Sequence, residues 1–208
     1  MRSKARLEAF SDGIFAIAAT LLVLDLGVPK TGSSLLEGLL HQWPAYAAYA
    51  TSFLTIGIIW VNHHAVLERL ERVDRGLLFL NLILLLFVAL IPFPTKVLAQ
   101  YLQSGGADAH VAAAAYGVAM ILMGLSFSIL NYYATARGLM AGQQRLTFMQ
   151  QVRFSIGLVM YAVGTGVALI DARIALLIYA ALAVYYVIEP LMAATLDGDA
   201  TPRIDSFR

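Results

Sequence analysis

Long runs without a charged residue alternate with short polar segments along the chain. Four runs contain no Asp, Glu, Lys or Arg, and a fifth is charge-free up to Glu189 and stays apolar to Leu196. The apolar opening segment has Asp12 near one end and Asp25 near the other. A helix needs about 20 residues to cross about 30 Å of hydrocarbon, so the pattern predicts six transmembrane helices. They fall within residues 10–26, 38–67, 76–95, 109–136, 154–170 and 174–196.

The apolar runs lack the alternation of a membrane β-barrel, whose strands are about ten residues of alternating polarity. Residues 82–90, for example, are all apolar. Six helices occupy about 120 of the 208 residues, which leaves only short loops. We therefore expect an all-α membrane protein with a single six-helix domain, residues 1–196, and a short polar tail, residues 197–208.

Two segments predict departures from straight spans. Pro92 and Pro94 should break or kink the end of the third span, because proline lacks a backbone N–H and restricts the residue before it. Residues 33–42 carry four leucines at helical spacing. This pattern predicts either a short helix at the outer membrane interface or an early start of the second span.

Composition and charge narrow the class of protein. Hydrophobic residues make up 60% of the chain and charged residues 13%, against about 45–50% and about 25% in soluble domains. The mean hydropathy is +0.76. These values exclude a soluble enzyme and a disordered protein, and a net charge of +1 supplies no basic field for a nucleic acid. With no cysteine there is no disulfide and no cysteine metal site.

Lysine and arginine gather on one side of the predicted membrane, and cytoplasmic segments carry an excess of both residues. Eleven of the 14 lie at the two termini or in the second-to-third and fourth-to-fifth loops. We therefore expect both termini in the cytoplasm. The eleven are Arg2, Lys4, Arg6, Arg69, Arg72, Arg75, Arg137, Arg145, Arg153, Arg203 and Arg208, and the other three are Lys30, Lys96 and Arg173.

The first span combines an apolar stripe with a carboxylate. At about 100° per residue, one face holds Gly13, Ile17, Thr20, Leu21 and Leu24. A carboxylate in hydrocarbon costs about 2.5–3.5 kcal/mol and therefore faces protein or water. Asp12 lies about 140° from Ile17, so we expect it to point away from the stripe and into the bundle. Periodicity alone leaves the stripe open to two interpretations, ordinary helix packing and a functional surface.

The cytoplasmic end of the second span carries a polar cluster made of Trp60, Asn62, His63 and His64. Adjacent histidines point about 100° apart on a helix, so they do not clamp a metal as an i, i+4 pair would, and Glu68 is the only further candidate ligand. We expect no metal site. The cluster should instead hydrogen-bond to Arg6, Ser11 or Asp12 of the first span, although Trp60 also fits an interfacial belt. Asn81 in the third span needs a partner as well.

These motifs together resemble the transmembrane protein 175 potassium-channel family. The resemblance starts from Arg6, Phe10, Ser11, Asp12 and Gly13 at the opening of the first span. Three further matches are Trp60-x-Asn62-His63-His64, Asp74 with Asn81, and Pro92-Phe93-Pro94-Thr95. Motifs cover residues 6–95, and the remaining spans match by hydropathy only. A single six-span unit is similar to prokaryotic members, which implies a homotetramer in the cell (inner) membrane of a prokaryote.

The resemblance implies that four copies of the first span line a central pore without a carbonyl filter. By the family pattern, Ile17, Leu21 and Leu24 form the constriction and Thr20 is the hydroxyl position used in selectivity. Ala16 stands where some relatives have Ser, which implies weaker selectivity. An aliphatic ring can gate by dewetting, and potassium, with its weaker hydration shell, should pass more easily than sodium.

The expected function is thus a potassium-permeable leak channel, with potassium ions, the lipid bilayer and other copies of the chain as partners and with no cofactor, catalytic residue or nucleic acid. Asp25 either concentrates cations at the outer mouth or caps the span at the headgroups. A secondary transporter or proton-coupled carrier is the alternative, which predicts broken helices and midplane charges. A further alternative is a membrane subunit that has no ion pathway of its own.

Overall fold

Helices account for nearly all of the residues that the computed structural model describes, which are 4–29, 34–141 and 148–198, with side chains placed in 4–29, 34–141 and 156–188. In chain order the elements are α1 (Lys4–Leu21), the 3₁₀ helix η1 (Leu22–Asp25), α2 (Leu35–His41), α3 (Trp43–Glu68), α4 (Arg75–Leu90), α5 (Pro92–Ser104), α6 (Gly106–Ala136), α7 (Phe148–Ala168) and α8 (Ala172–Gly198).

The predicted all-α fold is confirmed. Four helical stretches are long and apolar enough to cross a membrane, namely Lys4–Asp25, Trp43–Glu68, Arg75–Ser104 and Gly106–Ala136. The fifth and sixth predicted spans correspond to α7 and α8, whose apolar stretches in the described part of the chain are shorter, Ile156–Ala168 and Ala172–Ile188. The number of six spans therefore stays a prediction. Residues 199–208 of the predicted tail lie outside the described residues.

The prolines interrupt the third span where the sequence predicts a break. Helix α4 ends at Leu90 and α5 begins at Pro92, with only Ile91 between them. The span does not end near Thr95 as expected. It continues to Ser104, because Pro92 at the first position of a new helix needs no backbone N–H bond. The four leucines of residues 33–42 form the short helix α2, which Gln42 separates from α3.

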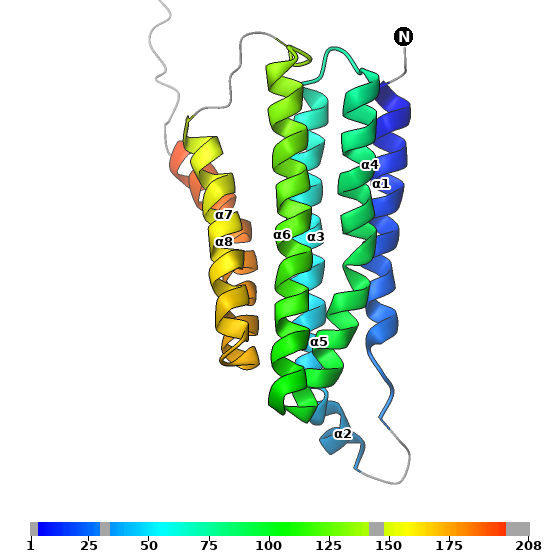
Figure 1. Ribbon diagram of the computed structural model, residues 1–208, viewed down its shortest axis with the longest axis vertical. Helices are drawn as coiled ribbons and strands as arrows, with labels where there is room; N and C mark the ends of the chain where they lie inside the picture. The colour runs from blue at the N-terminus through cyan, green and yellow to red at the C-terminus, as the bar shows by residue number, and fades with distance from the viewer. Residues whose placement is uncertain (1–3, 30–33, 142–147, 199–208) are drawn as a thin grey trace, which may run out of the picture.

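The basic segments gather at one end of the molecule. The start of α1, the α3–α4 connection and the end of α6 lie together at the top of Figure 1, and α2 lies at the opposite end. The basic residues of these segments are Lys4, Arg6, Arg69, Arg72, Arg75 and Arg137. The arrangement has the charge asymmetry on which the predicted topology rests.

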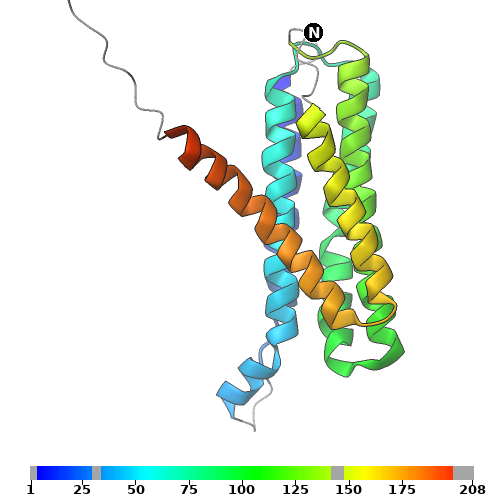
Figure 2. The ribbon, with the colours of Figure 1, turned by 90° about the vertical axis from the view of Figure 1, so that its left-hand side faces the viewer.

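The helices of the bundle pack mainly around α1 and α6. Helix α1 packs against α3 and α4, while α6 packs against α4, α5 and α7. The α7–α8 hairpin lies on the far side from α1 in Figure 1, and Figure 2 shows α8 crossing the bundle obliquely. Tyr179 of α8 is fully buried against α6 and α7. Its ring fits because Gly117 and Gly164 have no side chain there, and a Cβ on either would collide with it.

Asp74 caps α4 and couples this helix end to pH. Its Oδ1 accepts from the Leu77 backbone N–H at 2.8 Å and its Oδ2 from the Tyr133 hydroxyl at 3.0 Å. The Leu77 bond, with Tyr133 and the charge of Arg137, lowers the pKa of Asp74 below its ordinary value of 3.8. A lowered pKa means that the cap stabilises the fold above the unfolded-state pKa and is lost as the pH falls through the folded-state value.

We expect Asp74→Ala to lower the free energy of unfolding by about 1 kcal/mol near neutral pH, since an N-cap is removed. Asp74→Asn keeps a capping oxygen but has no titrating group, so it should lose less and should show a smaller decline in acid. Thermal unfolding of the purified protein between neutral pH and about pH 3 measures both effects. Parallel acid profiles of the wild type and Asp74→Asn would contradict this assignment.

Candidate functional site

Helix α1 has one face that is fully buried in the chain. Its members follow each other at helical spacing and have exposed fractions of 7% or less. They pack toward α3 and α4, the helices that contact α1 most extensively. This face consists of Leu7, Ser11, Phe15, Ala18 and Leu22.

The predicted stripe lies on the other side of α1, where none of the described helices covers it. Ile17, Leu21 and Leu24 are exposed by 59%, 42% and 73%, and Gly13 and Thr20 are exposed too. The outward faces of other helices also bear exposed apolar side chains, including aromatic ones such as Phe79 and Tyr132. The stripe on α1 combines large aliphatic groups with a glycine and a hydroxyl.

Thr20 and Leu24 depart from a plain helical stripe. The Thr20 hydroxyl donates to the backbone oxygens of Ala16, at 2.9 Å, or Ile17, at 3.0 Å. Its oxygen keeps lone pairs on the exposed face. Leu24 belongs to η1, where three residues complete a turn instead of 3.6. The i+7 relation between Ile17 and Leu24 is therefore not that of a continuous α-helix, although both side chains are exposed.

Asp25, the predicted outer-mouth residue, forms an ion pair. Its Oδ1 lies 3.1 Å from Nζ of Lys96 on α5, and its side chain is only 15% exposed. The pair offsets the charge that would attract a cation. Both residues fall on the same predicted side of the membrane, which is the only signal in the sequence that could have suggested the pairing.

A buried polar network fixes α1 to α3 and α4. The His63 Nε2–H donates to Asn81 Oδ1 at 2.7 Å, and Asn81 Nδ2 donates to Ser11 Oγ at 3.0 Å. Ser11 in turn donates to the Leu7 backbone oxygen at 2.9 Å. All three side chains are at most 3% exposed, and the Phe15 ring lies 5.3 Å from that of His63. The expectation that Asn81 needs a partner is confirmed.

Asp12 does not point into the bundle of its own chain, and that expectation is wrong. Asp12 is exposed, and the neighbouring Ser11 takes the buried position. The Asp12 Oδ1 accepts a hydrogen bond from Trp60 Nε1 at 2.9 Å. One of the predicted hydrogen bonds between the second span and the first is therefore present. His64 turns outward as well, stacking on Trp60 and lying 3.4 Å from Glu68.

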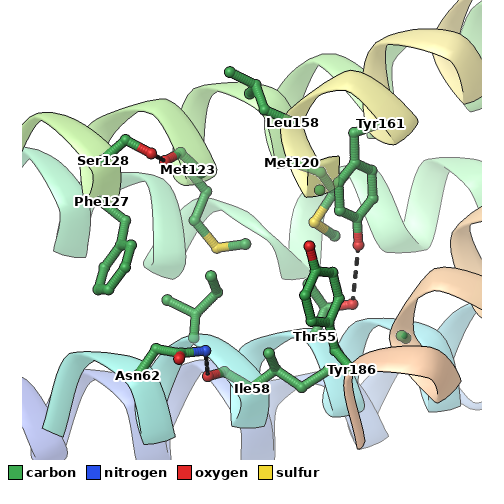
Figure 3. Close-up of a pocket in the computed structure, with 14 residues that line it drawn as sticks. Thr55, Ile58, Asn62, Met120, Met123, Phe127, Ser128, Leu158, Tyr161 and Tyr186 are labelled. Carbon is green, nitrogen blue, oxygen red and sulfur yellow. Dashed lines mark hydrogen bonds between the residues drawn. The ribbon is translucent and has the colours of Figure 1, made fainter. Parts of the chain in front are cut away.

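The remaining motif residues separate into different environments. Arg6 and Phe10 lie on the exposed side of α1. Asn62 faces away from α1, where it lines a pocket among α3, α6, α7 and α8 (Figure 3). Among the described residues there is no group of three or more His, Cys, Asp or Glu that could hold a metal ion. The residues of the motif W-x-N-H-H thus face three different sides of α3. Trp60 and His64 face outward, His63 faces the buried network, and Asn62 faces the pocket.

Comparison with known proteins identifies the family. The chain is 44% identical over 210 residues to a Streptomyces collinus protein named as a potassium channel, covering 96% of this chain and 99% of that protein. Residues 6–92 match the family model described as endosomal/lysosomal potassium channel TMEM175. The chain belongs to the TMEM175 family. The resemblance seen in the sequence motifs is thereby confirmed.

Two further TMEM175 relatives extend the comparison. The crystal structure of a homologue from Chamaesiphon minutus, described as a lysosomal potassium-selective channel TMEM175 homologue, superposes with a TM-score of 0.80 at 34% identity. The match covers 91% of this chain and 98% of that one. The human protein named endosomal/lysosomal proton channel TMEM175 is 39% identical over 100 residues, which are 43% of this chain and 20% of that protein.

Proposed function

We propose that the chain is a potassium-permeable, leak-type channel in which four copies place α1 around a central pore. The observation that carries the proposal is the stripe on α1, which is exposed among the described helices although the opposite face of α1 is fully buried. A homotetramer supplies a symmetry axis toward which four such stripes can turn. The potassium-channel names of the bacterial TMEM175 relatives support the choice of ion.

The constriction would be formed by Ile17, with Leu21 and Leu24 farther along the pore. Four aliphatic side chains in a narrow lumen exclude water, and an ion that enters must give up part of its hydration shell. Potassium gives up water more easily than sodium, so the pore favours it modestly. Thr20 offers a hydroxyl oxygen beside the ring, whereas Ala16 offers none. Asp25, paired with Lys96, contributes a weakened charge to the outer mouth.

The buried network has a positioning role in this proposal. Ser11, His63 and Asn81 hold α1 in one rotation against α3 and α4, and that rotation decides which residues meet the axis. The Asp12–Trp60 bond lies outside this network, on the surface of the single chain. The exposed Arg6, Phe10 and His64 are placed where contacts between copies could form.

We further propose the inner membrane of a prokaryote as the location, with both termini in the cytoplasm. The support is the cluster of arginines at one end of the bundle and the bacterial origin of the relatives. Residues 1–196 would then form one six-helix channel domain.

Ion flux into liposomes tests the channel against the carrier. With purified protein in vesicles and a potassium diffusion potential, we expect voltage-driven potassium flux that does not saturate and needs no second ion. A pH dye in the same vesicles reports any coupled proton movement. Saturating flux that requires protons or sodium in a fixed ratio would overturn the channel in favour of a carrier.

A further inference from the structure

A second feature of the bundle lies away from α1 and has no part in the proposed ion path. It is a cavity of about 70 Å³ among α3, α6, α7 and α8, partly open to the surroundings. Figure 3 shows Asn62 and Phe127 at one end of it, Tyr161 and Tyr186 at the other, and Met123 between them. On the six-span topology of the proposed function, on which this inference rests, the cavity would lie within the bilayer and its open side would meet lipid.

The lining chemistry restricts what the cavity can hold. Its wall is largely apolar, and among the lining residues that the structure describes there is no Asp, Glu, Lys, Arg or His to pair with an ion. Two of the polar groups use their protons internally. Thr55 donates to the Thr51 backbone oxygen at 2.8 Å, and Tyr161 lies 3.3 Å from the Thr55 hydroxyl, to which it donates.

Asn62 supplies an amide oxygen as an acceptor. Its Nδ2 donates to the Ile58 backbone oxygen at 2.8 Å, and within the described part of the chain no side chain donates to its Oδ1. An amide oxygen on an apolar wall favours a ligand that brings one hydrogen-bond donor. An engineered cavity of about 150 Å³ holds benzene, which has six heavy atoms. By volume, this cavity has room for about three heavy atoms, so it can hold one end of a ligand and not a whole ligand molecule.

We propose that this cavity binds the hydroxyl end of a neutral, single-chain amphiphile from the bilayer, with the hydroxyl donating to Asn62 Oδ1 and the alkyl chain leaving through the open side. The uncharged lining residues of the described part of the chain and an amide oxygen that accepts from no side chain match a long-chain alcohol that arrives from the bilayer. Asn62, a motif residue that the ion path and the buried network leave unused, would then be a binding residue of this site.

Photolabelling with 3-azioctanol tests the proposal on the full chain in liposomes. Its diazirine sits close to the hydroxyl, so adducts should concentrate on pocket residues such as Met123 and Tyr161, and 1-octanol should compete. Asn62→Leu removes the acceptor at similar size, and since one hydrogen bond contributes about 1 kcal/mol, competition by 1-octanol should weaken about fivefold. Octyl methyl ether, which has no donor, should compete poorly with the wild type.

Two leucine variants complete the experiment. Gly124 lines the cavity, and the nearest atom to a Cβ there is Leu158 Cδ1 at 4.0 Å, so Gly124→Leu fills the space and should abolish pocket labelling. Gly166 on α7 is exposed with no atom within 4 Å of a Cβ, so Gly166→Leu should label like the wild type. Size-exclusion profiles confirm that the variants assemble. Labelling spread evenly over all lipid-facing helices, or unchanged in both Asn62→Leu and Gly124→Leu, would overturn the proposal.

Discussion

Replacing Ile17 by Asn should raise the potassium current at least about tenfold and lower the preference for potassium over sodium. Asn is close to Ile in size, but its amide can hold water in the neck. A hydrogen bond to one amide contributes about 1 kcal/mol, so two of the four amides in the ring suffice to remove the 1.4 kcal/mol that corresponds to about a factor of ten in rate. Bi-ionic reversal potentials and current amplitudes in reconstituted bilayers measure both quantities.

Matched variants separate wetting from general damage. Ile17→Leu keeps the ring apolar and should leave the current near that of the wild type. Thr20→Ala should lower selectivity with a smaller gain in current, because it removes a hydroxyl without opening the neck. Both residues are exposed in the chain, so neither variant should alter folding of the protomer. If Ile17→Asn assembles normally but changes neither the current nor the reversal potential, the stripe is an ordinary packing face and does not line the pore.

Asn81→Ala should lower the free energy of unfolding by about 2–6 kcal/mol, because it leaves two buried polar groups unpaired at about 1–3 kcal/mol each. These groups are the Nε2–H of His63 and the hydroxyl oxygen of Ser11, which bond to Asn81 at 2.7 and 3.0 Å. Thermal unfolding in detergent and the assembled fraction on size exclusion measure the loss.

Asn131 provides the control for that variant. It is also a buried asparagine, at 3% exposed, but its Oδ1 has no hydrogen-bond partner among the described residues. Asn131→Ala should therefore cost less than Asn81→Ala. Asp12→Ala should likewise cost less, since Asp12 is exposed and loses one bond to Trp60. Equal losses in the two asparagine variants would show that the network adds no stability beyond side-chain burial.

Hydropathy predicted the helical fold well, because a span must be long and apolar wherever it lies in the bundle. The break near Pro92 was predictable for a local reason, the missing backbone N–H. The rotation of α1 was not. The helical angle of about 100° per residue places Asp12 relative to Ile17, but it does not say which face the neighbouring helices cover. The buried face includes Ser11 instead of the next residue, Asp12. The Asp25–Lys96 pair depends on how α5 packs beside η1, which no local pattern records.

The placement of α7–α8 on the far side from α1 would give the proposed tetramer a hub and a rim. With four α1 helices at the hub, the hairpins would form the outer belt. The family model ends at residue 92, after the hub helices and before the belt. In the proposed tetramer, α3 and α4, which both contact α1, would separate the ion path from the cavity among α3, α6, α7 and α8.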